Sequence, residues 1–349
     1  MAWLRYREIG LLAVLLLFHV SCESQLEYDI SSREPLPVLN ALWNAENSEH
    51  KVYLCTSNAY HVSAGNDTAT VSCFINGTLV YRTYQYELLR TQVSHIDFQE
   101  YTIRARMKAG DHVKIVAELP NAEIIGESVV PPPPSVQIDT TSVADDFYYN
   151  SPYVVENRRD YTISMIIKDV VGEPSYYRVF SPTLHSEAHQ TEDDLLLKQK
   201  DWLWVPIDEK DPIFKNVTVQ FPFEVLLEFP FLSGTTNSTH VFSDDLFADQ
   251  SYRLSFRLRQ RDYDLYIGHK EYADMRVRLR LASLTHGEFT YLLAANASMS
   301  SFADPLAEPV VLPYNVKGGL GFFGVENIFE QEIDLKRCYY FSRDSLLNP

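Results

Sequence analysis

The strongest constraint on the fold is a series of short segments in which apolar and polar residues alternate. In residues 112–118, for example, Val113, Ile115 and Ala117 share one face of an extended chain and polar residues occupy most of the other. Similar segments occur at 51–57, 69–75, 78–83, 101–107 and 124–129. Asn76-Gly77 between two apolar runs is typical of a β-hairpin. The pattern predicts strands with one buried face, as the sheets of a sandwich require.

A boundary between two domains is predicted at residues 131–135, which are four prolines followed by Ser135. Proline fixes φ and lacks an N–H donor, so this segment is expected to be a stiff spacer. Residues 35–130 before it predict a small immunoglobulin-like β-sandwich. Longer strands are expected after it, at 161–169, 175–181, 217–228, 251–261 and 274–284, which together predict a larger antiparallel β-sandwich or barrel-like domain over 136–349. The expected fold class is all-β.

Three further features belong to this second domain. A helix is predicted over residues 287–299, where Phe289 and Leu292 keep helical spacing. The glycine-rich segment 315–325 predicts a bent final strand, because missing Cβ atoms allow a bulge or the close approach of another backbone. Alternate positions of 253–259 carry three arginines and Ser255, and those of 276–280 carry three arginines. This pattern predicts a polar sheet surface or a barrel interior, with acidic loops as partners.

Residues 1–22 have the composition of an export signal. Arg5 and Arg7 precede an apolar run over 11–18, which is shorter than the roughly 20 residues of a bilayer-spanning helix. Cys22 directly follows Ser21, so the pattern resembles a bacterial lipobox in which Cys22 receives the lipid, although His19 stands where leucine is usual. An ordinary signal peptide with an incidental cysteine is the alternative. Residues 23–34 are polar and are expected to be a tether.

The acidic composition limits the partners. The formal net charge is -17, which argues against nucleic acid, since that binding depends on Lys and Arg neutralising phosphates. The same charge repels an anionic membrane surface, so membrane attachment would depend on the lipid at Cys22.

Four cysteines are present, and three remain if Cys22 is lipidated. Cys55 and Cys73 fall in neighbouring predicted strands, and an exported protein can form disulfides. Two alternatives stay open for this pair, a disulfide or two small buried thiols. Cys338 is expected to be buried and unreactive, and no spacing resembles a zinc site.

An acidic turn is the candidate metal site. Asp244, Asp245 and Asp249 lie within six residues and could supply part of a calcium shell, because calcium binds several oxygen ligands in flexible geometry. The turn lacks the glycine and spacing of an EF-hand, and the alternative is a solvated turn before the strand at Ser251. No other cofactor is expected.

Catalytic motifs are weak throughout the sequence. His185 and His189 are four residues apart, but the segment has no apolar stripe and is expected to be an exposed loop. Carboxylate pairs that could imitate a glycosidase site are expected by chance in so acidic a chain, namely Asp262 with Asp264 and Asp208 with Glu209. No nucleophile elbow, P-loop or dinucleotide motif occurs, so an enzyme is not predicted.

Aromatic residues in predicted loops are the stronger candidates for contacts with a ligand or partner. They are Tyr148, Tyr149, Tyr153, Trp202 and Trp204. Aromatic faces on loops bind sugar rings, peptides or proteins, whereas the alternative is that they fold back over a sheet edge.

Four segments occur in one order, namely 110–134, 173–180, 242–256 and 315–325. Together with the lipobox they resemble the Bacteroidota outer-membrane lipoproteins of domain-of-unknown-function family 4249. The resemblance implies an outer-membrane lipoprotein that is often encoded beside a SusC-type TonB-dependent transporter. It implies no catalytic residues.

These observations predict a lipid-anchored outer-membrane protein, facing the cell surface, that binds or caps nutrient for a TonB-dependent transporter without catalysis. Two alternatives remain. One is a surface hydrolase acting on glycans or peptides, and the other is a structural or adhesion lipoprotein.

Overall fold

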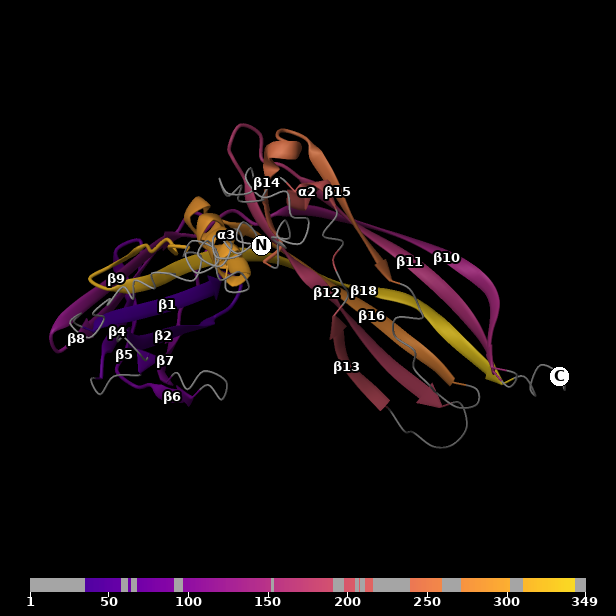
Figure 1. Cartoon of the computed structure of the whole chain (residues 1–349), viewed down its shortest axis with the longest axis horizontal. Helices are drawn as coiled ribbons and strands as arrows, with labels where there is room; N and C mark the ends of the chain where they lie inside the picture. Colours follow the sequence, from indigo (N-terminus) through magenta and orange to yellow (C-terminus); the bar gives the residue numbers. More distant parts are fainter. Residues whose placement is uncertain are drawn as a thin grey trace, which may run out of the picture.

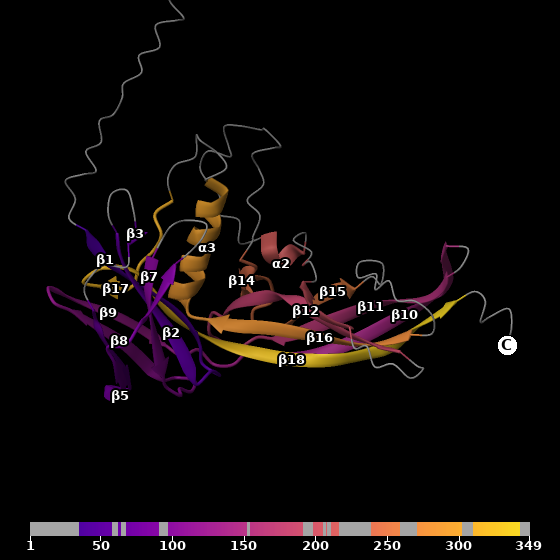
Figure 2. The same ribbon diagram turned by 90° about the horizontal axis from the view of Figure 1, so that it is seen from below.

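The computed structural model describes residues 35–57, 62–63, 68–90, 97–151, 154–190, 198–204, 207, 211–215, 239–258, 271–301 and 310–342. These residues form mostly antiparallel sheets with one long helix, so the all-β prediction is confirmed. Two lobes lie side by side, the N-terminal strands in one and β10 to β16 in the other (Figure 1). Strand β18, Leu320–Ser342, runs along both lobes (Figure 2).

The N-terminal lobe is a sandwich of two sheets. The first contains β1 (Leu36–Asn44), β2 (Glu49–Ser57), β7 (Asp97–Arg104) and β6 (Glu87–Arg90), with the short β3 (Val62–Ser63) beside β2. The second has the order β17 (Val316–Lys317), β9 (Ala122–Val129), β8 (His112–Leu119), β4 (Thr70–Ile75) and β5 (Thr78–Thr83).

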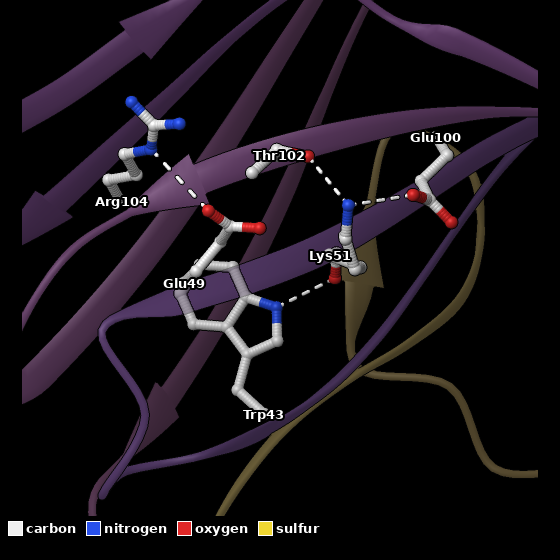
Figure 3. Close-up of polar contacts among 6 residues, drawn as sticks. All are labelled: Trp43, Glu49, Lys51, Glu100, Thr102 and Arg104. Atoms are coloured by element: carbon white, nitrogen blue, oxygen red, sulfur yellow. Dashed lines mark hydrogen bonds and ion pairs between the residues drawn. The ribbon is translucent and has the colours of Figure 1, made fainter.

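The alternation in sequence produces the two faces of these strands. Trp43, Tyr101 and Phe323 are fully buried between the sheets, and the Trp43 indole N–H donates to the Lys51 carbonyl at 2.8 Å. On the outer face, the Lys51 ammonium donates to Thr102 Oγ1 and forms an ion pair with Glu100, both at 2.8 Å (Figure 3). Such partly exposed pairs contribute about 0–1 kcal/mol each, so the core stabilises this lobe far more than its charges do.

The sandwich takes its last strands from the far end of the chain. The first part of β18 pairs in parallel with β1, from Val38 opposite Leu320 to Asn44 opposite Glu326, and β17 pairs with β9. The predicted close approach of another backbone is confirmed, since Gly321 has φ +112° and a Cβ there would lie 2.0 Å from the Leu39 carbonyl oxygen. The backbones of β1 and β18 therefore lie so close at Gly321 that a Cβ on this residue would collide with β1.

The prolines connect β9 to β10 and pack against β18. Pro131 and Pro134 are buried, while Pro132 and Pro133 are exposed. The side-chain amide of Asn327 in β18 donates to the Pro131 carbonyl at 3.1 Å. The spacer is thus held against the strand that both lobes share.

The second lobe is also a sandwich. One layer contains β10 (Ser135–Ser151), β11 (Val154–Lys168) and β15 (Ser251–Leu258). The facing layer contains β13 (Lys198–Trp204), β12 (Tyr176–Gln190), β16 (Glu271–Leu284) and the rest of β18, with β14 (Val241–Ser243) beside β12. The two layers are joined where the start of β11 pairs with the end of β18, so their strands belong to one continuous sheet. Ile163, Phe256 and Leu279 are buried between the two layers. The described strands form no closed barrel, so the sandwich is the correct alternative. The predicted strand 217–228 lies outside the described residues.

The arginine rows lie on sheet surfaces, as one of the two alternatives predicted, but their partners are different from those expected. Arg278 pairs with Glu332 at 2.7 Å and Glu330 at 3.4 Å on the adjacent strand β18, and Arg253 pairs with Asp139 of β10 at 2.9 Å. Acidic residues on strands, not on loops, neutralise these arginines.

Candidate functional site

Two aspartates of the acidic turn hold neighbouring elements together. Asp244 begins a short 3₁₀ turn, Asp244–Leu246, and accepts a hydrogen bond from the Ser175 N–H at 2.8 Å. Asp249 accepts from the Gly172 N–H at 2.9 Å, and its own N–H donates to Asp169 at 2.8 Å. Both interactions attach the turn after β14 to the turn between β11 and β12.

Each of the three carboxylates in this turn accepts a hydrogen bond from within the protein. Asp244 is only 5% exposed, and this burial raises the pKa of its carboxyl, although the hydrogen bond from Ser175 opposes the shift. Asp245 is exposed and accepts from the Ser243 hydroxyl at 2.6 Å. The three carboxylates therefore bind separate donors within the protein. Among the described residues, no group of three or more His, Cys, Asp or Glu side chains is arranged to hold a metal ion.

The two cysteines of the proposed pair lie in different sheets and are free. Cys55 is in β2 and Cys73 in β4, and these strands are not neighbours. Alternation places Cys55 on the face of Lys51 and Tyr53, whereas Cys73 lies in the sandwich core. Of the two alternatives, the structure contains two buried thiols. Burial raises the pKa of Cys55 to about 11 and that of Cys73 to about 12.

The aromatic candidates lie on strands, so their prediction as loop residues is wrong where the structure describes them. Tyr148 and Tyr149 belong to β10, and Trp202 and Trp204 to β13. The positions of these four side chains lie outside the described part, as does all of Tyr153. The ends of these strands carry polar residues that are typical of loops. For this reason the sequence predicted loops where the strands continue.

Some of the remaining candidates lie on described strands, and the others lie outside the described part of the chain. His185 and His189 lie in β12, so the predicted loop there is wrong, and His185 is buried. Cys338 lies in β18, but its side chain is outside the described part. The lipidation residue Cys22 and the carboxylate pairs, Asp262 with Asp264 and Asp208 with Glu209, also lie outside the described residues.

The most unusual site was not predicted from the sequence. Helix α3, His286–Ser301, confirms the predicted helix and rises from the sheet near the junction of the lobes (Figure 2). The Thr285 hydroxyl accepts from the Glu288 N–H at 3.2 Å and so caps the helix. Leu292 packs with Ala282 and Leu284, and Tyr291 stacks on Phe322 at a ring distance of 4.3 Å. The first turns of α3 are therefore docked on the outer face of the sheet.

Glu288 in the first turn of α3 is fully buried, at 0% exposure. Its carboxylate lies over Gly324 of β18, where a Cβ would be 2.9 Å from the carboxyl carbon. Neither carboxylate oxygen has a hydrogen-bond partner in the described part of the protein. Desolvation, together with the nearby Glu326 carboxylate, raises the pKa of Glu288 to about 8, against a smaller opposing effect of Arg178.

A sequence signal for this site exists, but it indicates a different structure. Thr285-His286-Gly287-Glu288 matches a capping box, in which the glutamate would bond back to the first residue of the motif. In the structure, the Thr285 hydroxyl accepts from the Glu288 N–H, but the Glu288 carboxylate does not bond back to Thr285. It lies over Gly324 of β18 instead. A negative charge in the first turn interacts favourably with the helix dipole by about 0.3–1 kcal/mol, which is too little to offset complete burial of a carboxylate.

The fold and these sites define an all-β protein of two sandwiches that share their longest strand. No helix among the described residues is long and apolar enough to cross a membrane. A family model described as "Domain of unknown function (DUF4249)" matches residues 23–332, and the chain belongs to this family. Membership of this family, inferred from the four segments, is thereby confirmed. No curated protein matches the sequence.

Proposed function

We propose that this protein is a lipid-anchored accessory of a TonB-dependent transporter on the surface of the outer membrane, where it binds or caps nutrient without catalysis. The observation that carries the proposal is the N-terminal pattern, an export signal ending at Cys22. Residues 23–34 form a polar connection between Cys22 and the first strand. A chain of that length spans at most about 40 Å, which would keep the two sandwiches close to the membrane.

An exposed apolar edge supports a protein partner. Among the described strands, β5 pairs only with β4 and β6 only with β7, so both are edge strands. They carry exposed apolar side chains, Leu79 and Val80 on β5 and Leu88 and Leu89 on β6. Unpaired edges with apolar side chains are typical contact sites for another chain.

The experiment is a mild-detergent pull-down of the tagged protein from outer membranes, with bound proteins identified by mass. We expect a large β-barrel transporter in roughly equal amount. Leu88→Asp, which changes an exposed side chain on the edge strand, should reduce its recovery. Leu320→Asp, which changes an exposed side chain away from that edge, is the control and should not reduce it.

Recovery of the lipoprotein without a transporter would refute the proposal. Activity on a panel of glycans and peptides would then support a surface hydrolase, and a stable partner of another kind would support an adhesion role. A Cys22→Ser variant tests the anchor separately. It should lose membrane association and incorporation of labelled fatty acid.

A further inference from the structure

Charged side chains follow one face of β18 from the exposed surface to the base of α3. Glu332 and Glu330 both pair with Arg278 of β16 at the exposed end. Further along the same face, Glu326 is 9% exposed, and one of its carboxylate oxygens has no hydrogen-bond partner in the described part of the chain. Gly324, on which Glu288 lies, is the next residue on that face. The row thus ends in two buried carboxylates, Glu326 and Glu288.

The charged groups around Glu288 come from three elements. Glu326 of β18 repels it, and Arg178 of β12 attracts it. Arg280 of β16, together with Arg178, attracts Glu326. Both guanidinium groups also lie over the Phe180 ring, at 4.6 and 4.7 Å. On α3 itself, His286 packs beside Tyr176 with ring centroids 5.2 Å apart. From β1, the apolar Leu42 side chain lies over Gly324 beside the Glu288 carboxylate, since a Cβ on Gly324 would be 3.0 Å from Leu42 Cδ2.

We propose that α3 is a pH-responsive latch at the junction of the two lobes, docked on β18 while Glu288 is protonated and released when that proton is lost. Ionised Glu288 would be a second buried negative charge beside Glu326, over a glycine that supplies no side chain to bind it. Release uncovers Phe322, Ala282 and Leu284 on the outer face of the sheet. This inference does not rest on the transporter proposal.

The direction of the pH effect follows from linkage. Burial raises the pKa of Glu288 from its ordinary 4.5 to about 8, so the docked state binds the proton more tightly than the released state. Docking is therefore fully favoured below pH 4.5 and is progressively lost as the pH rises towards 8. For pKa values of 4.5 and 8, the equilibrium constant for release increases about 70-fold between pH 5 and pH 7.

Hydrogen exchange of the full mature chain measures this release. An isolated helix of this length is marginal in water, so its amides exchange once α3 leaves the sheet. We compare wild type with Glu288→Gln at the same pH, because the ratio of their rates cancels the intrinsic effect of pH on exchange. For peptides of α3, this ratio should rise about 70-fold from pH 5 to pH 7, as the release constant does. For peptides of β8 it should stay constant.

Two further variants complete the test. Glu326→Gln removes the repelling carboxylate. In this variant, α3 exchange should increase less between pH 5 and pH 7 than it does in wild type. This variant also serves if Glu288→Gln does not fold. The exposed Glu173→Gln should behave as wild type. An unchanged α3 ratio between pH 5 and pH 7, or an equal increase in α3 and β8, would overturn the inference.

Discussion

A phenylalanine close to the C-terminus is expected to determine the stability of the N-terminal sandwich. Phe323 in β18 is 0% exposed and packs edge-on against Trp43, with ring centroids 5.0 Å apart and an interplanar angle of 82°. A Cβ on Gly126 would lie 2.7 Å from the Phe323 Cβ, so the ring lies directly against β9. Phe323→Ala should therefore destabilise the protein by about 3–5 kcal/mol, including about 1 kcal/mol for the aromatic pair.

The assay is urea unfolding followed by the fluorescence of Trp43. A mature chain that begins at residue 23 and carries Trp202→Phe and Trp204→Phe leaves Trp43 as the reporter. Leu320→Ala is the matched control, since Leu320 lies on the same strand but is 37% exposed, and it should cost less than about 1 kcal/mol. Equal effects of the two substitutions, or a loss below 1 kcal/mol for Phe323→Ala, would refute the placement of β18 in this core.

Three other predictions concern the same architecture. A fragment of residues 35–130 should be unfolded by circular dichroism, because the core members Val316, Phe323 and Val325 are missing. Fusing residues 314–327 to the fragment should restore strand structure. A fragment that folds without them would contradict this topology. Gly321→Ala should cost more than about 2 kcal/mol in urea unfolding, since its φ is +112° and the Cβ would collide with Leu39, whereas Gly287→Ala, with open space around it, should be neutral or stabilising. In a chain with Cys22→Ser and Cys338→Ser, Cys55 and Cys73 should react with a thiol reagent at pH 8 only after unfolding. Both thiols are buried, and their pKa values are raised to about 11 and 12. Rapid labelling of the folded chain would contradict the buried placement of these two thiols.

Local patterns in the sequence were sufficient for the helix and for several of the strands. The alternation of residues 112–118 becomes β8, and the hairpin signal at Asn76-Gly77 connects β4 to β5. The helical spacing of residues 287–299 becomes α3. Each of these features is determined by neighbours within a few residues, so each leaves a periodic or turn signal.

Long-range pairing left no such signal. The parallel contact of β1 with β18 joins the two ends of the folded chain, and no turn residue encodes it. The cysteine pair was misplaced for the same reason, since neighbouring segments in sequence were assumed to be neighbouring strands in space. Glu288 was missed because a glutamate in the first turn of a helix usually caps it; its burial depends on Gly324, a residue of another element.

The shared strand limits how the two lobes can move. Strand β18 has 23 residues and so extends about 75 Å, pairing first with β1, then with β16 and finally with β11. The partner changes at Glu326 and Asn327, where Asn327 also binds the proline spacer. A hinge between the lobes would have to break strand pairing on one side of this point and the Asn327 contact on the other. The lobes are therefore joined by continuous backbone pairing rather than by a flexible linker, and movement at the junction is expected in α3, which is attached by its first turns and carries the buried carboxylate.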